Sequence, residues 1–292
     1  MKYGGVIGDS KYKVLSLIPP KYLPKSIFIT GSTFFTSIEK IIKQDRIDYP
    51  FIIKPDVGER GKDVELICNK NELQEYLAHK SNDLIIQEYV DYALEIGILY
   101  FRFPGMEKGG ITSMVQKSFL TVTGDGKSSL LQLMSTQIRA VGRLDYLQEK
   151  FKNKLGDILP DGKKLYLEPI GNHCKGTTFY DDRHLINDKL NLVFDKIALE
   201  IHGFYYGRFD IKVPSLEDLY HGKNIIIFEL NGVSSEVAHV YDPNYKLIQA
   251  YKDIAANMKI ISLIAKKNHD NGHPYDSLWV FLKDLQMHFK GQ

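Results

Sequence analysis

The chain is poor in several features that define common protein classes. Its 292 residues include two cysteines, Cys68 and Cys174, which are too few for a zinc framework or a disulfide scaffold. Cys68 ends an apolar run, so we expect a buried strand residue in a reducing setting. No apolar stretch approaches the ~20 residues that cross a bilayer, and the range 1–5 lacks the apolar core of a signal peptide. We therefore expect a cytoplasmic protein without a membrane span.

The chain also lacks an excess of charge of one sign. Lys and Arg number 38 and Asp and Glu number 36, which gives a net charge of +2. Dedicated nucleic-acid binders usually carry a large basic excess, so we expect no nucleic-acid partner. The hydrophobic fraction of 43% and the charged fraction of 25% are those of a globular protein. Such a length allows two or three packed lobes, and an oligomer is compatible with this composition.

Helical and strand patterns alternate along the chain, and some strands look paired as hairpins. This mixture predicts an α+β protein with separate lobes. We expect an N-terminal segment over 1–46, a small lobe over 47–90 and a large lobe over 91–292. The periodicity predicts helices over 33–43, 71–77, 130–151, 185–202 and 245–267, and strands over 51–53, 64–68, 84–86, 96–103, 111–122, 205–213 and 225–230.

A short apolar strand followed by a glycine-containing loop is the first candidate binding segment. Lys54 ends the run 51–53, and Pro55 stops further strand pairing. An ammonium group on a rigid strand suits a polyphosphate, and Gly58 and Gly61 let backbone N–H groups turn toward phosphate oxygens. The alternative is a hairpin with incidental surface charges. The loop is not a Walker A loop, because no Gly-Lys-Ser/Thr follows the glycines.

The second candidate is the segment 84–90, which ends a strand and enters a connection. Backbone at a hinge between two lobes can offer one N–H and one C=O group to the edge of adenine. Glu95 lies seven residues after Glu88 and could accept hydrogen bonds from both ribose hydroxyls. The alternative is a solvated glutamate.

The strongest signal is a pair of strands that carry carboxylates. Side chains alternate along a strand, so Arg208 and Asp210 share one face of the range 207–211. Glu229 and Asn231 likewise share a face, with Phe228 and Leu230 expected in the core. If the strands pair, two carboxylates and an amide converge, and such oxygen ligands suit Mg²⁺. The alternative is a structural ion pair of Arg208 with one of the carboxylates.

These three segments, in this order, resemble the ATP-grasp superfamily. The resemblance covers about residues 47–245 and is carried by Ile53-Lys54-Pro55 with the loop through Lys62, by Gln87-Glu88-Tyr89-Val90 with Glu95, and by Arg208-Phe209-Asp210 and Glu229-Leu230-Asn231-Gly232. It implies an ATP-grasp fold in which two α+β lobes clasp ATP. It also implies transfer of the γ-phosphoryl group to a carboxylate and capture of the acylphosphate by an amine or a thiol.

The resemblance assigns a role to each motif residue. Mg·ATP is the implied cofactor, with Mn²⁺ as an alternative metal. The residues implied to bind ATP are Lys54, Gly58, Glu59, Arg60, Gly61, Lys62, Gln87, Glu88, Tyr89, Val90 and Glu95. The residues implied to bind the metal are Asp210, Glu229 and Asn231, and Arg208 beside them is assigned to catalysis.

Two polar segments are candidates for the substrate side. The loop 171–177 contains Asn172 and His173, which we assign to catalysis as oxyanion-type and base groups, and Lys175, which we assign to substrate binding. The alternative for His173 is a structural role. Directly after the metal strand, Ser234, Ser235 and Glu236 are placed to touch an acceptor.

Within the superfamily the chain is similar to the D-alanine–D-alanine ligase-like group and to uncharacterised bacterial proteins related to it. These share the motifs 54–61, 122–127 and 168–174. The turn 123–127 also resembles that of peptide-forming members, but Asp-Gly alone favours a type I′ hairpin turn.

One departure concerns the N-terminus: the ligases that make D-alanyl-D-alanine carry a full Rossmann-like domain before the central lobe. Here a short extension precedes that lobe, and Lys40 and Lys43 are candidates for a second phosphate lysine.

We therefore predict an ATP-dependent carboxylate–amine or carboxylate–thiol ligase that acts on small molecules. A small-molecule kinase that stops at phosphoryl transfer is the first alternative, and a nucleotide-binding partner without turnover is the second. ADP release that requires both an acid and an amine favours the ligase. A stable phosphorylated product from one substrate favours the kinase.

Overall fold

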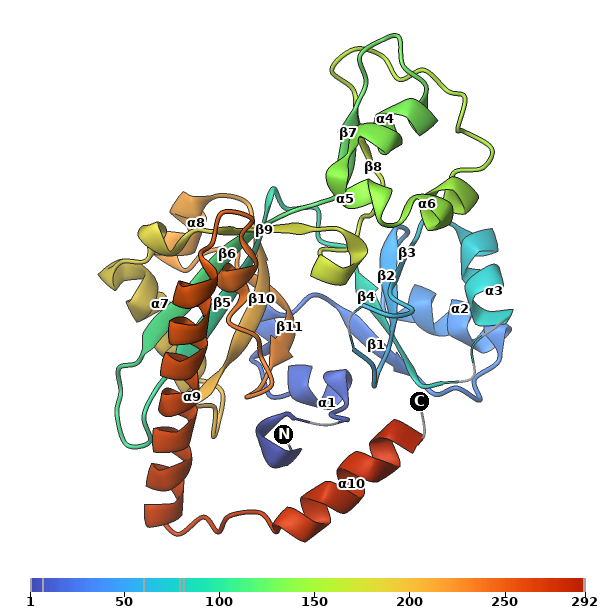
Figure 1. Ribbon diagram of the computed structural model, residues 1–292. Coiled ribbons are helices and arrows are strands. Elements are labelled where there is room, and N and C mark those ends of the chain that lie inside the picture. Colours follow the sequence, from blue (N-terminus) through green and yellow to red (C-terminus); the bar gives the residue numbers. More distant parts are fainter. Residues whose placement is uncertain (1, 7, 60, 79, 81, 291–292) are drawn as a thin grey trace.

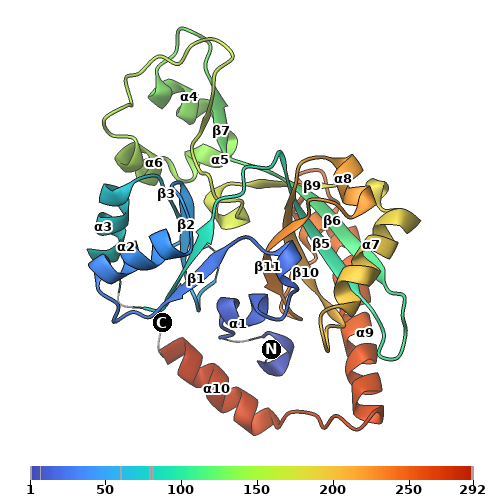
Figure 2. The ribbon, with the colours of Figure 1, turned by 180° about the vertical axis from the view of Figure 1, so that it is seen from behind.

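The computed structural model describes residues 2–290 apart from residues 7, 60, 79 and 81, and it has three lobes (Figure 1; Figure 2 shows the reverse side). Helices and antiparallel sheets are combined, as expected for an α+β protein. Among the described residues, no helix is both long enough and apolar enough to traverse a bilayer.

The small lobe is a four-stranded antiparallel sheet in the order β1-β4-β2-β3. Its strands are β1 (Ser26–Ile29), β2 (Phe51–Pro55), β3 (Glu65–Ile67) and β4 (Leu84–Glu88). Helices α2 (Phe35–Gln44) and α3 (Lys70–Ala78) cover one face through buried apolar side chains such as Ile38 and Leu73. Because strand side chains alternate, Lys54 and Gln87 lie on the opposite face.

The boundary of the small lobe differs from the one that the sequence suggested. The segment 1–46 was set apart as an N-terminal extension, yet β1 pairs with β4 along its whole length. Helix α2 packs on the same sheet. Residues from Ser26 onward therefore belong to the small lobe. Long-range strand pairing, which local periodicity does not report, accounts for the difference.

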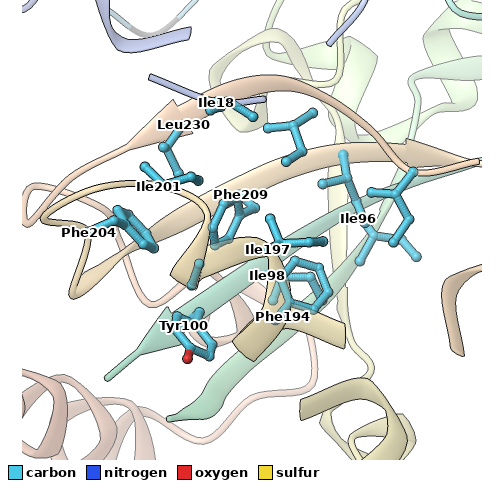
Figure 3. Close-up of a cluster of buried hydrophobic side chains, with 14 of the residues drawn as sticks. Ile18, Ile96, Ile98, Tyr100, Phe194, Ile197, Ile201, Phe204, Phe209 and Leu230 are labelled. Carbon is cyan, nitrogen blue, oxygen red and sulfur yellow. The ribbon is translucent and has the colours of Figure 1, made fainter. Parts of the chain in front are cut away.

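The large lobe is a five-stranded antiparallel sheet in the order β11-β10-β5-β6-β9. Its strands are β5 (Leu94–Phe101), β6 (Gly110–Ser118), β9 (Thr178–Asp181), β10 (Tyr206–Val213) and β11 (Ile226–Asn231). Helices α7 (Asp188–Leu199) and α8 (Leu216–His221), together with α1 (Lys11–Leu15), build the main core on one face, where Phe194 and Phe209 are fully buried (Figure 3).

The other face of this sheet is divided between a helix and the candidate site. Helix α9 (Leu247–Asp270) packs Ile264 against Leu99 and Tyr206 at one end of the sheet. Further along the same face, β10 carries Arg208 and Asp210. Because α9 leaves this part uncovered, polar side chains there can meet the small lobe.

An inserted lobe follows β6 and appears in green at the top of Figure 1. It contains β7 (Thr121–Thr123), α4 (Leu130–Thr136), α5 (Ile138–Val141), α6 (Leu144–Lys150) and β8 (Lys164–Tyr166) around its own core of residues such as Met134 and Leu147. The single helix predicted over 130–151 is wrong, because Gln137 takes an extended conformation with ψ 112° and separates α4 from α5.

The remaining elements are short or terminal. Short 3-10 helices occur at Lys2–Gly4, Pro20–Tyr22, His173–Lys175, Arg183–Leu185 and Ala238–Tyr241. Helix α10 (Leu278–Lys290) follows α9 and contacts the N-terminal segment, where the Tyr3 and Phe281 rings meet edge to face. Both cysteines are free and exposed. The prediction that Cys68 is buried is therefore wrong, because β3 ends one residue earlier.

Candidate active site between the two sheets

The paired strands β10 and β11 bring the predicted metal residues together. Asp210 lies opposite Glu229, and Arg208 lies opposite Asn231. Phe209 and Leu230 point into the core, as the alternation predicted. Phe228 does not, because the register shifts between Asp210 and Ile211. Such a bulge gives one strand an extra residue and turns its side chain, so the Phe228 ring faces the site instead.

Asp210 is the centre of a buried charge cluster. Its side chain is 1% exposed, and its Oδ2 accepts hydrogen bonds from Arg208 Nε and from Asn231 Nδ2, each at 3.1 Å. Lys117 Nζ from β6 lies 2.9 Å from Oδ1. Burial opposes ionisation of Asp210, but Arg208 and Lys117 outweigh it and lower the pKa of the carboxyl group. The carboxylate is therefore charged.

Lys117 connects this cluster to Glu95. Its ammonium is 3.1 Å from Glu95 Oε1, and both side chains are 6% exposed. Lys212 approaches Glu95 Oε2 at 3.8 Å. Burial disfavours the ammonium form of Lys117, but Asp210 and Glu95 raise its pKa overall. The carboxylate assigned to ribose is thus engaged by two lysines, and Gly171 packs so closely that a Cβ there would lie 2.0 Å from it.

Lys54 reaches the site from the small lobe. It donates hydrogen bonds to Gln87 Oε1 at 3.0 Å and to the Phe228 carbonyl of β11 at 3.1 Å. Burial lowers the pKa of its ammonium to about 8, although Glu229 opposes this shift. Gln87, itself held by Ser26 through Nε2, positions Lys54 with its side chain rather than through the hinge backbone.

The predicted hinge follows directly after β4. Tyr89 and Val90 make no backbone–backbone hydrogen bond within the described part of the chain, so their N–H and C=O groups are available to a ligand. The Glu88 side chain instead accepts a hydrogen bond from the Lys25 backbone at 3.2 Å. The Tyr89 ring lies beneath the Lys212 ammonium at 4.9 Å.

The loop after β2 has the predicted glycine geometry at one position. Gly61 has a φ of +67° and packs against the Asn172 side chain. Glu59 and Lys62 are exposed, and the Lys62 N–H bonds to the Glu59 carbonyl. Gly58 has no positive φ. Arg60, also assigned to this loop, lies outside the described residues.

The sequence analysis did not identify Lys11, which begins α1 and contacts the loop after β2. Its ammonium hydrogen-bonds to the Gly58 carbonyl, and Asp56 Oδ1 accepts from the next backbone N–H at 2.9 Å. Lys11 is also close enough to lower the pKa of Lys54. The signal was Ser10, which caps α1 immediately before Lys11. Lys40 and Lys43 are exposed on α2, on the other side of the sheet from Lys54.

The polar side chains of the loop 171–177 mainly make contacts within the protein. Asn172 Oδ1 accepts a hydrogen bond from the Cys174 N–H at 2.8 Å. Lys175 donates to the Val64 carbonyl of the small lobe at 2.9 Å. His173 Nε2 lies 3.0 Å from Arg139 NH2, and burial together with Arg139 lowers the pKa of His173. Because a guanidinium only donates, His173 Nε2 accepts here.

In the segment 234–236, which follows β11, the two serine side chains also make contacts within the protein. Ser235 is buried and its hydroxyl bonds to the Asn231 and Gly232 carbonyls. Ser234 donates to the Gly5 carbonyl at 2.6 Å. Both serine hydroxyls therefore stabilise the backbone. Glu236 is exposed, and its carboxylate hydrogen-bonds to the Tyr241 side chain.

The turn 123–127 does not close a hairpin. Strand β7 pairs with β8, some forty residues later, at Thr121↔Tyr166. Asp125 accepts hydrogen bonds from the Lys127 and Ser128 N–H groups at 2.9 and 2.7 Å, and these bonds lower its pKa to about 2. The turn leads into α4 rather than into a partner strand.

The donor set around Asp210 fits a hard divalent cation. Asp210 Oδ1 is buried and has no aligned hydrogen-bond donor among the described residues, although Lys117 is within ion-pairing distance. Glu229 and Asn231 add oxygen donors from the neighbouring strand, and Mg²⁺ prefers oxygen. No cluster of three or more His, Cys, Asp or Glu side chains suited to a metal occurs in the described ranges, so protein ligands alone would be few. Mg²⁺ commonly completes its shell with water and substrate phosphates.

A cavity of about 1060 Å³ adjoins this cluster. Its wall contains Lys117 and Lys212 of the large lobe, Tyr89 of the hinge, Leu66 of the small lobe and Lys150 of the inserted lobe. Pockets for small ligands range up to ~1,000 Å³. The cavity between the three lobes is therefore large enough for a small-molecule ligand of nucleotide size.

Comparison with known proteins gives partial matches. No family model matches the chain. It is 40% identical over 65 residues to a formate-dependent phosphoribosylglycinamide formyltransferase of Prochlorococcus marinus, a match that covers 20% of the chain and 17% of that protein. The corresponding enzyme of Sulfolobus acidocaldarius is 33% identical over 92 residues, 29% of the chain and 23% of the relative. The chain thus matches about a fifth of the length of these curated relatives.

Among solved structures, the VanG D-Ala:D-Ser ligase of Enterococcus faecalis is 14% identical with a TM-score of 0.47, and the alignment covers 87% of this chain and 61% of the ligase. The matches to the formyltransferases support the resemblance to the ATP-grasp superfamily that the motifs indicate, over less than a third of the chain.

Proposed function

We propose that the chain is a Mg²⁺-dependent ATP-using enzyme that joins a carboxylate to an amine, or to a thiol, through an acylphosphate. The observation that carries this proposal is the meeting of the two sheets. Lys54 of the small lobe bonds to the backbone of β11, one residue before Glu229. Cations suited to phosphate thus lie beside carboxylates suited to a metal.

The nucleotide would lie across this junction. In this proposal Lys54 and Lys11 would contact phosphate oxygens, which is supported by the contact of Lys11 with the loop that contains Gly61. The free backbone groups of Tyr89 and Val90 suit the edge of a nucleobase. Glu95 would bind ribose if the nucleotide displaces or shares its contacts with Lys117 and Lys212.

Asp210, Glu229 and Asn231 are the residues that would hold the metal. Bound Mg²⁺ neutralises charge on the transferring phosphoryl group. Arg208 and Lys117 flank Asp210 and would stabilise the anionic oxygens of the same group. The site therefore combines positioning with charge compensation, which is what phosphoryl transfer requires.

The reaction has two steps. A carboxylate oxygen of the acid attacks the γ-phosphorus, the bond to the β-phosphate oxygen breaks, and ADP leaves. The amine nitrogen then attacks the acyl carbon and loses a proton, and inorganic phosphate departs with one former carboxylate oxygen. His173 Nε2 is held by Arg139, so we assign the role of proton acceptor to the exposed Glu236.

The experiment is a screen for release of ADP and phosphate from Mg·ATP with amino acids, dipeptides and small acids, each with and without an amine. The proposal predicts release that requires both an acid and an amine or thiol, and that is lost in Lys54→Ala. Lys40→Ala is the matched control, because Lys40 is exposed on the far side of the sheet. Release with a single substrate that becomes stably phosphorylated would replace the ligase with a kinase.

A further inference from the structure

One face of α6 in the inserted lobe carries charged and aromatic side chains. Arg143, at its N-cap, Tyr146 and Lys150 follow one another at helical spacing. Leu147 lies next to this face, four residues after Arg143, and is fully buried in the core of the inserted lobe. All three polar positions line the cavity that Lys117 also lines. The charged face of α6 therefore looks toward the candidate active site.

Hydrogen bonds to backbone carbonyls hold both cations, Arg143 and Lys150. Arg143 NH1 bonds to the Lys175 carbonyl, and its guanidinium lies over the Tyr146 ring at 4.7 Å from the ring centre. Lys150 Nζ donates to the Leu167 carbonyl at 3.0 Å. Each contact uses one N–H and fixes the side chain. A guanidinium has five N–H donors and an ammonium has three, so both groups retain donors for a ligand.

Glu168 is the carboxylate that forms ion pairs with both Arg143 and Lys150. It is 2% exposed, and its Oε2 is 3.5 Å from Lys150 Nζ and 3.9 Å from Arg143 NH1. These distances give ion pairing, but Oε2 has no hydrogen-bond donor among the residues the structure describes. Glu168 therefore keeps the two cations together without consuming their N–H groups. A buried carboxylate oxygen without a hydrogen bond is costly, and the charges of Arg143 and Lys150 offset that cost.

We propose that Arg143 and Lys150 form a subsite of the inserted lobe that binds a second carboxylate of the acid substrate. The proposal rests on the proposed function and names its substrate class: an acid with two carboxylates. The planar fork of an arginine matches a carboxylate, and Lys150 adds a point charge. One carboxylate would lie here, while the other reaches the phosphoryl group near Lys117, which lines the same cavity.

The first test needs no turnover. Thermal melts at fixed ionic strength compare succinate, glutarate and adipate with butyrate as a monocarboxylate. At least one dicarboxylate should stabilise the wild-type protein more than butyrate does, since only binding to the folded state raises the melting temperature. The Arg143→Met/Lys150→Met variant should bind that dicarboxylate about tenfold more weakly or worse, the effect of losing charged hydrogen bonds.

Two further variants control this test. Lys152→Met removes a 63%-exposed lysine from the segment just after α6 and should leave binding unchanged. Adding Glu168→Gln to the double variant avoids a buried unpaired charge, so loss of binding can be separated from loss of folding. Equal stabilisation by all the acids, or wild-type affinity in the folded double variant or in the folded variant that also carries Glu168→Gln, would overturn the subsite.

The second test uses ADP release. The double variant should raise KM for a dicarboxylate about tenfold or more with little change in KM for ATP. A rise in KM for ATP alone would mean that the cations bind a nucleotide phosphate, which overturns the substrate assignment. If no pair of substrates yields ADP while dicarboxylate binding still depends on Arg143 and Lys150, the proposed function fails and the subsite stands.

Discussion

Replacing Lys117 with methionine tests the charge cluster directly. The lysine is 6% exposed and compensates two carboxylates, Asp210 at 2.9 Å and Glu95 at 3.1 Å. Removing one partner of a buried ion pair costs ~3–5 kcal/mol. Arg208 still pairs with Asp210, and Lys212 remains near Glu95, so we expect the lower end, about 3 kcal/mol.

For a protein of this size, such a loss lowers the melting temperature by roughly 6–12 °C. The assay is a thermal melt in a chelating buffer without nucleotide, which separates folding from ligand binding. Lys152→Met is the control, since Lys152 pairs with Glu149 on the surface and exposed pairs contribute little. A Lys117→Met protein that melts within about 2 °C of the wild type would refute the reasoning that Lys117 neutralises buried charge.

Three further predictions concern binding, turnover and pH. Lys54→Ala should weaken ATP affinity about tenfold or more in calorimetry, because a buried charged donor is lost; unchanged affinity would remove Lys54 from the site. Glu229→Gln should fold normally yet lose about a hundredfold or more in the rate of ADP release, because an amide replaces an anionic metal ligand; a wild-type rate would remove Glu229 from the metal set. His239 is buried between Ser113 and Asp253, and burial lowers its pKa below 6.5. The unfolded chain then binds more protons, so stability is lost as pH falls below about 6.5; His239→Gln should flatten that loss in melts, whereas the exposed control His202→Gln should not.

Strand alternation predicted much of the candidate site. The period of two fixes which side chains share a face, so Arg208 and Asp210 could be grouped from the sequence, with Glu229 and Asn231 opposite. The pairing register then brought the two groups together. The same logic failed for Phe228, because a bulge depends on the partner strand and leaves no local signal.

Residues that act through tertiary contacts were harder to find. Lys117 follows an apolar stretch of β6, and only the fold shows that it stands between Glu95 and Asp210. Lys11 is 47 residues away from Gly58 in the sequence, yet its ammonium hydrogen-bonds to the Gly58 carbonyl. The inserted lobe was hidden because the apolar spacing of 130–151 continues across a break at Gln137. Contacts between distant segments are absent from any local pattern.

The central claim is that the γ-phosphoryl group of ATP passes to a substrate carboxylate at the cluster of Lys54, Lys117 and Asp210. The most direct test follows oxygen-18 from a labelled carboxylate during turnover with the amine, with mass analysis of the phosphate and the nucleotide. The account predicts ADP as the nucleotide product and inorganic phosphate that carries one labelled oxygen. Unlabelled phosphate, or AMP and pyrophosphate as products, would contradict it.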